Sequence, residues 1–529
     1  MGRRRPRAAA AIAAAALWLL LGSAAATADP EAPSLNAALF AKIDAFLASE
    51  RQATGIPGLA VVIVAGDRIV HTAALGVADG SGRPVTPDTP FVLASLSKAF
   101  TATAVMQLVE AGRIELGAPV QRYVPWFRVA DDAASASITV AQLLHHTSGL
   151  PTVPVTNDDQ DGGALERGVR ALASERLLFD PGAGYHYTNA DYDVLGFVVQ
   201  AVSGTAFDRY VEEHIFQPLG MSHSHVLPAD AVADGASEGF YRWFGLLTMP
   251  TRVPQPRSEG PAAMMFSSAS DMGRWIIANL NGGLASEARI ISAAGMDTLH
   301  APVAESSDEF HAYAMGWDVR PYWEALVVAG EQPADYLIPA LVEHGGAAPD
   351  GHTYVGLVPE RGWGFAVLMN IFDMADQDPY MHVEQGIQRI LAGKEPLPLT
   401  LGLDPLGRNA RSTGLLLLLL ELVSLSWSVL TLRRWRRPGT TRPAAGRAVV
   451  ALAAPLLLDV LTLWLLLIHV PARFDTTLPV ILTYQPDAAW IVLPLLLLAG
   501  IWGPIRTIGL TALYIRRPQA LADLAAPTS

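Results

Sequence analysis

Ser95 and Lys98 stand three residues apart at the start of a stretch whose apolar residues repeat with helical period up to Gly112. Residues at i and i+3 share one face of a helix, so the two side chains lie together if a helix begins near Ser95. A hydroxyl becomes a good nucleophile when a neighbouring base takes its proton, and a buried lysine in its neutral form is such a base. The S-x-x-K spacing predicts a covalent acyl-enzyme; the alternative is a solvated helix start without chemistry.

Lysine is rare in this chain, which strengthens the catalytic interpretation. Lys42, Lys98 and Lys394 are the only lysines among 37 basic residues, and all the others are arginine. Arginine does not lose its proton in proteins. It can therefore supply the positive charge of a lysine but cannot act as a base. Lysine at position 98 therefore indicates a function that arginine cannot serve.

Two further motifs follow in the chain. Tyr187 and Asn189 form a Tyr-x-Asn motif at the end of the turn-rich loop 181–189. His344 is followed by two glycines and stands one residue beyond the apolar run 337–342. These residues offer a second hydroxyl, an amide and a backbone without side chains, all of which an acyl-transfer site uses.

With the three motifs in this order, the sequence resembles the serine β-lactamase and penicillin-binding-protein superfamily, specifically its class C, esterase and D-aminopeptidase branch. The resemblance covers about residues 35–395 and extends to the phrases at 143–151 and 313–317. It implies that Ser95 attacks the substrate carbonyl, and that Lys98 and Tyr187 share the roles of general base and later general acid.

The resemblance also implies how the substrate is held. Asn189 binds its amide, and the backbone N–H groups of Ser95 and Ala347 form the oxyanion hole. His344 and Gly346 belong to the substrate-binding motif, but true β-lactamases carry a lysine at the position of His344. Because that lysine helps to bind the carboxylate of the drug, its replacement argues against β-lactam hydrolysis as the main task.

The chain begins like an exported protein. Four arginines among its first seven residues precede an Ala/Leu-rich run at 8–21, and Ala26-Thr27-Ala28 is a small-x-small cleavage site. This pattern predicts a signal peptide at 1–28; the alternative is a retained signal anchor. The chain has no cysteine, so neither disulfides nor thiolate metal sites contribute. No cofactor is implied, and the histidines lack the spacing of metal ligands.

Charge divides the chain into two parts. The whole chain has a net charge of −13, made up of −23 over residues 29–400 and +6 from residue 401 onward, with the signal arginines as the balance. A body this acidic does not attract nucleic acid. We expect a small peptide, amide or ester as substrate and membrane lipid as the other partner.

Strand-like runs stand at both ends of the region 35–395, and residues 90–300 are mostly helical or loop-like. This order predicts an α/β fold: an antiparallel sheet flanked by helices, plus an all-α insert, with the active site between them. The expected helices flanking the sheet are 35–53 and 382–393, and the expected strands are 58–64, 69–75, 313–320, 336–343, 352–358 and 363–370.

The C-terminal part contains three apolar runs long enough to span a membrane. Six arginines lie between the first and second runs, whereas the second loop has only Arg473. The positive-inside rule therefore places the first loop and the C-terminus in the cytoplasm and the hydrolase outside. The expected divisions are a signal peptide at 1–28, an extracytoplasmic hydrolase domain at 29–395, a linker at 396–411, three membrane helices within 412–517 (413–432, 448–470 and 488–515) and a cytoplasmic tail at 518–529.

This architecture indicates a multi-pass membrane protein with an outward-facing serine hydrolase. It also looks like the prodrug-activating peptidases of nonribosomal peptide pathways, such as the colibactin-maturation peptidase, which remove an N-acyl-D-amino-acid cap. The alternatives are a cell-wall D-alanyl carboxypeptidase, an esterase or a β-lactamase. A penicillin-recognising sensor without turnover is disfavoured, because the short cytoplasmic segments leave no room for an output domain.

Three charged residues fall inside the predicted membrane helices. Glu421, Asp459 and Arg506 lie at nearly the same depth when counted from the arginines that flank each helix. An ionisable group inside a membrane is costly and is usually paired. We expect the three to form one buried cluster with one carboxyl protonated; the alternative is that the third helix ends near Pro504 and leaves Arg506 at the surface.

Overall fold

The computed structural model describes residues 35–153, 158–303, 312–322, 339–399, 409–438, 443–473 and 477–516. The chain forms two compact units. The sheet unit comprises Met1–Tyr241, Met249–Phe372 and Gln377–Leu401, and the helical unit comprises Arg242–Thr248, Asp373–Asp376 and Gly402–Ser529. The predicted signal peptide 1–28, most of the linker 396–411 and the tail 518–529 lie outside the described residues.

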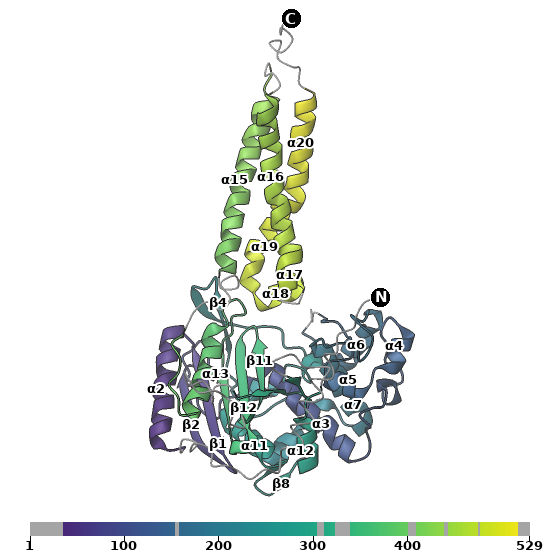
Figure 1. The fold of residues 1–529 in the computed structure, drawn as a ribbon, viewed down its shortest axis with the longest axis vertical. Coiled ribbons are helices and arrows are strands. Elements are labelled where there is room, and N and C mark those ends of the chain that lie inside the picture. Colours follow the sequence, from purple (N-terminus) through teal and green to yellow (C-terminus); the bar gives the residue numbers. More distant parts are fainter. Residues whose placement is uncertain are drawn as a thin grey trace, which may run out of the picture. The chain divides into compact units, whose positions relative to one another are not determined.

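The sheet unit is built on a seven-stranded antiparallel sheet with the order β2-β1-β13-β12-β11-β10-β9 (Figure 1). Its central strands are buried on both faces, as expected where helices cover a sheet. β1 and β13 are largely apolar, whereas β12 also buries His352 and Thr353. The strands are β1 (Gly58–Ala65), β2 (Arg68–Gly76), β9 (Ala312–Tyr313), β10 (Asp318–Pro321), β11 (Ala340–Ala348), β12 (Gly351–Val358) and β13 (Trp363–Met369).

Helices flank this sheet, which confirms the predicted fold class. α11 (Ala269–Leu280) packs on β1 and β13, while α2 (Ala37–Thr54) packs on β2 and on α13 (Asp378–Leu391). Gly386 of α13 allows the close approach of the last pair, because a Cβ there would lie 2.1 Å from Phe46 Cζ. The two flanking helices match the predicted helical stretches to within a few residues.

Helices and loops fill most of the middle of the chain. Helix α3 (Ser97–Glu110) lies at the centre of the core, where Phe100 stacks on Trp275 with ring centroids 4.1 Å apart. The other helices of this part are α4 (Asp132–Ser137), α5 (Val140–Leu144), α6 (Ala164–Ala171), α7 (Asn189–Ser203), α8 (Phe207–Val211), α9 (Gln217–Leu219), α10 (Pro228–Ala233) and α12 (Ala293–Leu299).

Two details of the strands differ from the sequence prediction. β11 continues through the two glycines that follow His344, whereas the prediction ended the strand at residue 343, because glycine weakens a strand signal. Short strand pairs also interrupt the helical middle: β3 (Phe91–Val92) with β6 (Phe266–Ser267), β4 (Gly239–Trp243) with β5 (Leu247–Thr251), and β7 (Leu284–Ala285) with β8 (Ala288–Arg289).

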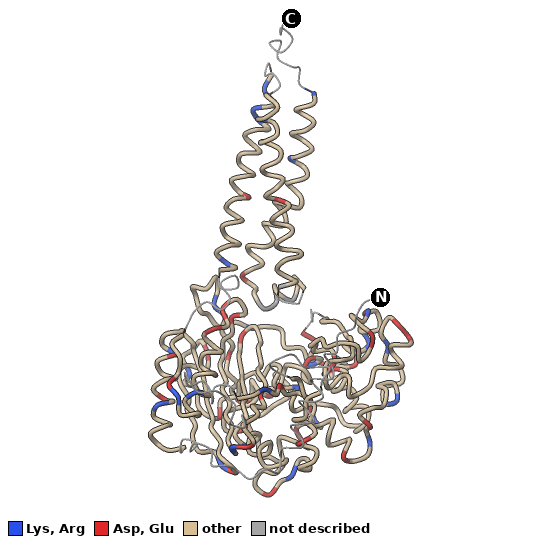
Figure 2. The backbone as a smooth tube through the Cα atoms, in the orientation of Figure 1, with Lys and Arg blue, Asp and Glu red and all other residues tan. Residues whose placement is uncertain are grey.

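Among its described residues, the helical unit contains three helices that are long and apolar enough to cross a membrane, as predicted. They span Ala410–Arg436, Ala445–Ala472 and Pro486–Ile515, and they lie side by side with their leucines largely exposed (Figure 1). Charged positions are sparse along their length (Figure 2). Their parts are α15 (Ala410–Arg436), α16 (Ala445–Trp464), α17 (Val470–Arg473), α19 (Ala489–Leu496) and α20 (Gly503–Ile515), and α18 (Leu478–Tyr484) precedes the third span.

The predicted charged cluster is present between these helices. Arg506 is 1% exposed and pairs with Asp459, and it also donates to Ser424 Oγ at 2.6 Å. Glu421 accepts a hydrogen bond from Thr462 Oγ1 at 3.1 Å. The alternative, a third helix that ends near Pro504, is wrong, because α20 continues through Arg506 to Ile515.

Candidate active site

Ser95 lies in a short 3-10 turn, Ala94–Leu96, between β3 and α3. The α-helix itself begins at Ser97, two residues after Ser95 and close to the helix start that the spacing requires. Ala94 has a φ of 48°, a left-handed conformation that is rare outside glycine and that often marks a functional turn. Ser95 is half-buried while its neighbours on both sides are fully buried, so its hydroxyl is the group that this turn presents.

Lys98 is completely buried beside Ser95. Its Nζ lies 3.3 Å from Ser95 Oγ, 2.7 Å from Asn189 Oδ1 and 2.9 Å from the carbonyl oxygen of Ala262. Burial lowers the pKa of Lys98 to about 7, against the opposing effect of nearby carboxylates. A large fraction of Lys98 is therefore neutral near physiological pH, as a general base requires.

Tyr187 approaches Ser95 from the loop that precedes α7. Its hydroxyl shares a hydrogen bond with Ser95, and Lys98 Nζ lies 4.7 Å from the centroid of its ring. Burial raises the pKa of Tyr187 well above its ordinary value, so the hydroxyl stays protonated at neutral pH. The following residue, Thr188, caps α7 by accepting from Ala190 N–H, which fixes where the loop ends.

Asn189 is the first residue of α7 and connects Lys98 to an acidic pair. Its Oδ1 accepts from Lys98, and its Nδ2 donates to Glu259 Oε2 at 3.1 Å. Asp193 lies one helical turn further on and accepts a hydrogen bond from the backbone N–H of Ala262. Burial raises the pKa of both Asp193 and Glu259, and each carboxylate also acts electrostatically on Lys98.

Sequence reasoning missed this acidic pair. The four-residue spacing of Asn189 and Asp193 does place them on one helix face, which is a usable signal. Glu259 gives no such signal, because it lies 70 residues from Asn189 and reaches it only through the tertiary fold.

His146 supports Tyr187 from behind. The two ring centroids are 4.4 Å apart, and His146 Nδ1 lies 2.7 Å from Asp191 Oδ2. Asp191 also accepts from Ser148 Oγ at 2.5 Å. Burial lowers the pKa of His146 well below its ordinary value, so the ring is neutral. This histidine packs the site and holds Tyr187 in place.

The third motif lies on β11, next to the turn that carries Ser95. A Cβ on Gly346 would lie 2.1 Å from the carbonyl oxygen of Leu93, so only glycine allows β11 to approach this closely. His344 is 2% exposed, and its Nδ1–H donates to the carbonyl oxygen of Gly345 at 2.6 Å. Burial, followed by the charge of Lys98, lowers the pKa of His344 to about 3. Ala347 is half-buried and pairs with His352 of β12.

The fold therefore brings the predicted residues together. Ser95, Lys98, Tyr187 and Asn189 form one bonded group. His344 stands beside it, with its ring centroid 6.4 Å from that of Tyr187.

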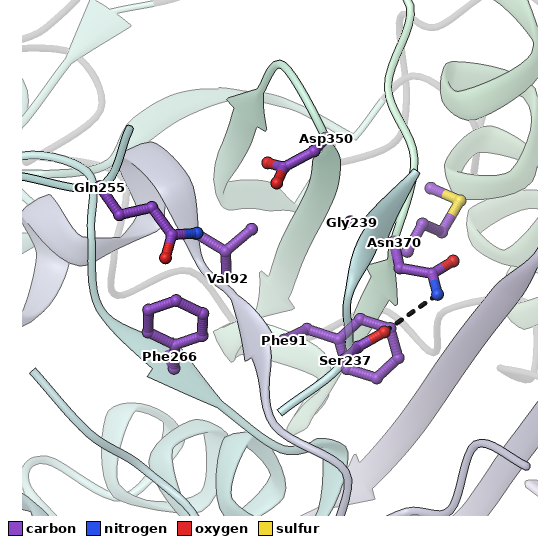
Figure 3. A pocket seen from close by; sticks show the side chains of 9 residues that line it. Phe91, Val92, Ser237, Gly239, Gln255, Phe266, Asp350 and Asn370 are labelled. Carbon is purple, nitrogen blue, oxygen red and sulfur yellow. Dashed lines mark hydrogen bonds between the residues drawn. The ribbon is translucent and has the colours of Figure 1, made fainter. Parts of the chain in front are cut away.

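A separate small pocket lies behind β3 (Figure 3). Its volume is about 20 Å³, which is room for one water molecule. Asp350, in the turn between β11 and β12, is 4% exposed, and its Oδ1 has no hydrogen-bond partner among the residues that the structure describes. In Figure 3 the carboxyl is directed toward the side lined by Gln255 and Val92. Burial raises the pKa of Asp350 to about 7.

Comparison of the sequence with known families gives a match over residues 42–386 to the family described as Beta-lactamase. The chain is 31% identical over 323 residues to Penicillin-binding protein 4 of Amycolatopsis lactamdurans, covering 60% of this chain and 81% of that protein. It is 26% identical over 334 residues to Protein flp of Staphylococcus aureus (strain MW2), covering 62% of this chain and 63% of that protein.

Two solved structures are similar in fold to about two thirds of this chain. The octameric penicillin-binding protein homologue from Pyrococcus abyssi aligns with a TM-score of 0.55 at 23% identity, over 68% of this chain and 78% of that one. The D-alanine carboxypeptidase AmpC from Burkholderia cenocepacia aligns with a TM-score of 0.54 at 24% identity, over 67% of this chain and 99% of that one. These similarities confirm the expected fold.

Proposed function

Because the chain belongs to the β-lactamase and penicillin-binding-protein family of serine hydrolases, we propose that it is a membrane-anchored hydrolase that cleaves an amide or ester through an acyl-enzyme on Ser95. One observation carries the proposal. A fully buried lysine with a pKa of about 7 lies 3.3 Å from the only half-exposed hydroxyl of its turn. A lysine in that state is a base in contact with a nucleophile.

Acylation proceeds by attack of Ser95 Oγ on the substrate carbonyl carbon. The proton of the hydroxyl passes to the neutral Nζ of Lys98, 3.3 Å away. The carbonyl oxygen, now negative, accepts from the backbone N–H groups of Ser95 and Ala347, which in such sites contribute several kcal/mol of transition-state stabilisation, roughly 3 for a single donor. Tyr187, protonated and bonded to Ser95, gives a proton to the leaving amine or alcohol and is reprotonated from Lys98.

Deacylation repeats these steps with water. Neutral Lys98 takes a proton from the attacking water, whose oxygen adds to the acyl carbon. Tyr187 gives its proton to Ser95 Oγ as that oxygen leaves, and it is reprotonated from Lys98. The Glu259–Asn189 bond holds the amide that contacts Lys98 Nζ, so the base keeps its position through both half-reactions.

For the substrate we propose a D-amino-acid-containing peptide or an N-acyl-D-aminoacyl prodrug. His344 is neutral at physiological pH, so the position that carries a lysine in β-lactamases offers no charge to a substrate carboxylate. This favours an amide whose recognition does not depend on a free carboxylate at that point. A cell-wall D-alanyl carboxypeptidase, which the resemblance to the penicillin-binding-protein superfamily also allows, is the second candidate.

We further propose that the hydrolase faces outward. This orientation follows from the proposed division of the chain into a cleaved signal at 1–28, a hydrolase at 29–395 and three membrane spans. The arginine-rich loop after the first span supports the same orientation. The C-terminus then lies in the cytoplasm.

The test is covalent tagging followed by product analysis. The full-length protein in detergent should be labelled by a serine-reactive fluorophosphonate, and Ser95→Ala should not, whereas Ser97→Ala should be labelled like wild type. A panel of N-acyl-D-aminoacyl amides, D-alanyl-D-alanine peptides, esters and a β-lactam, followed by mass spectrometry, then identifies the class. Equal labelling of wild type and Ser95→Ala would contradict the assignment of Ser95 as the nucleophile. Turnover restricted to β-lactams would contradict the proposed substrate class.

A further inference from the structure

The tip of the β4–β5 hairpin exposes large apolar side chains. Leu246 is 89% exposed, Leu247 58% and Phe244 40%. Trp243 adds a second ring, with its centroid 6.4 Å from that of Phe244. Large apolar side chains that are exposed together on one turn are more stable in an apolar environment than in water. The tip is therefore a candidate contact surface for a protein or a membrane.

Hydrogen bonds connect this tip to the membrane spans. The N–H of Phe244 donates to Asp487 Oδ2 at 2.7 Å, and Arg411 Nη2 lies 3.5 Å from the carbonyl oxygen of Arg242. Arg411 is the second residue of the span Ala410–Arg436, and Asp487 is the second residue of the span Pro486–Ile515. The tip, which belongs to the helical unit, therefore lies at the end where these two spans begin.

A network of buried charges fixes that position. Arg411 Nε donates to Asp487 Oδ2 at 2.8 Å, and Arg411 Nη1 donates to Asp373 Oδ2 at 2.7 Å. Gln485 Oε1 accepts from Arg411 Nη2 at 2.8 Å. The side chains of Asp487 and Asp373 are 0% and 2% exposed. Because paired and buried charges are costly to separate, the hairpin tip keeps a fixed height relative to the helices.

The length of α15 indicates where the hairpin tip lies relative to the bilayer. Its 27 residues extend about 40 Å at about 1.5 Å each, whereas the hydrocarbon core is about 30 Å thick. The first turn of α15, with Arg411, therefore reaches the headgroup layer, and the tip bonded to it lies at the same depth. Trp, Phe and Leu at the headgroup–acyl boundary are typical of interfacial anchors.

We propose that the tip Trp243–Leu247 inserts into the phospholipid interface and anchors the chain to the bilayer in addition to its three spans. Its occupant is lipid, held by apolar contact. The proposal depends on the membrane spans and not on the hydrolase activity, so Ser95 tagging and lipid insertion can fail independently.

The absence of cysteine from the chain makes a direct test possible. Full-length Leu246→Cys, labelled with the environment-sensitive dye NBD, is placed in phosphatidylcholine nanodiscs that carry doxyl groups at a shallow or a deep acyl position. We expect emission shifted to the blue and stronger quenching by the shallow doxyl. The matched control is Leu178→Cys, a leucine of the sheet unit with 55% exposure, whose label should emit as in water.

Two outcomes would overturn the proposal. Emission and quenching at position 246 equal to those at position 178 would mean that the tip is in water. A blue shift without quenching by lipid would mean that protein covers it, either a second copy of this chain or another partner. If labelling at position 246 disturbs folding, as judged by the thermal midpoint, Leu247→Cys gives the same reading at a neighbouring exposed position.

Discussion

In the proposed mechanism, the protonation state of Lys98 determines whether Ser95 can be activated. The pKa of Lys98 is about 7, and the base must be neutral, so kcat/KM for acylation should rise with pH, level off above about 7 and fall about tenfold per unit below it. Lys98→Arg keeps the charge and loses the base, so it should lower acylation almost as much as Lys98→Ala, by about a hundred- to ten-thousand-fold. Stopped-flow acylation across pH measures both effects. Near-normal rates in Lys98→Arg would contradict the role of Lys98.

Glu259, which is bonded to Asn189, raises the pKa of Lys98 through its negative charge. Replacing it by glutamine keeps an acceptor for Asn189 Nδ2 and removes a carboxylate that favours the charged form of Lys98. We expect Glu259→Gln to move the inflection of the acylation profile to lower pH while the plateau rate changes little. Glu259→Ala removes the acceptor as well and should lower the plateau.

The exposed Glu166, which pairs with Arg170 on α6, supplies the control variant Glu166→Gln. It should leave the profile unchanged. An inflection that does not move in Glu259→Gln would mean that Glu259 is already neutral in the working enzyme.

The turn between β11 and β12 carries a pH-dependent contribution to stability. The pKa of buried Asp350 is about 7 in the folded protein, against about 3.9 in an unfolded chain. Between these values the folded state binds more protons, so the free energy of unfolding decreases as pH rises, by at most about 1.4 kcal/mol per pH unit. Asp350→Asn should remove this slope and raise the thermal midpoint at pH 8.

The control for this experiment is Asp67→Asn, at an exposed turn. Thermal unfolding between pH 5 and 8 compares the two variants with wild type. Parallel curves for wild type and Asp350→Asn would show that Asp350 is ionised or bonded throughout this range.

The buried ion pair of Arg506 with Asp459 joins two of the three long apolar helices, and Arg506 also bonds Ser424 on the other. Removing one partner of a buried pair leaves an uncompensated charge, which costs about 3–5 kcal/mol, whereas removing all partners does not. Arg506→Leu should therefore lower the thermal midpoint in detergent more than the triple variant Arg506→Leu, Asp459→Leu and Glu421→Leu. Additive losses across the single, double and triple variants would contradict the cluster.

The sequence predicted those features that depend on local spacing. Ser95 and Lys98 are one helical turn apart, and the three apolar runs are recognisable by length alone. Features that depend on distant parts of the chain were missed: Glu259 reaches Asn189 across 70 residues. The β4–β5 hairpin was also missed, because the apolar residues of its tip do not alternate with polar residues as in a half-buried strand. Its position depends on hydrogen bonds to distant residues, which the sequence pattern does not show.

The orientation of the chain across a membrane is testable with single cysteines, because the chain contains no cysteine of its own. The arginines that follow the first span should keep Pro438 in the cytoplasm. In intact cells a membrane-impermeant maleimide should label Asp67→Cys, and it should label Pro438→Cys only after permeabilisation. The reverse pattern would contradict the outward orientation of the hydrolase.

The pairing of β1 with β13 sets the order in which the protein can mature. Gly58 N–H donates to Asn370 Oδ1 at 2.8 Å across 312 residues, and β1 lies between β2 and β13 in the sheet. Contacts this distant in sequence form late and slow folding. Until residue 369 has been translated, β1 has only one of its two neighbours, so the first hairpin is an aggregation-prone intermediate that a chaperone would have to protect.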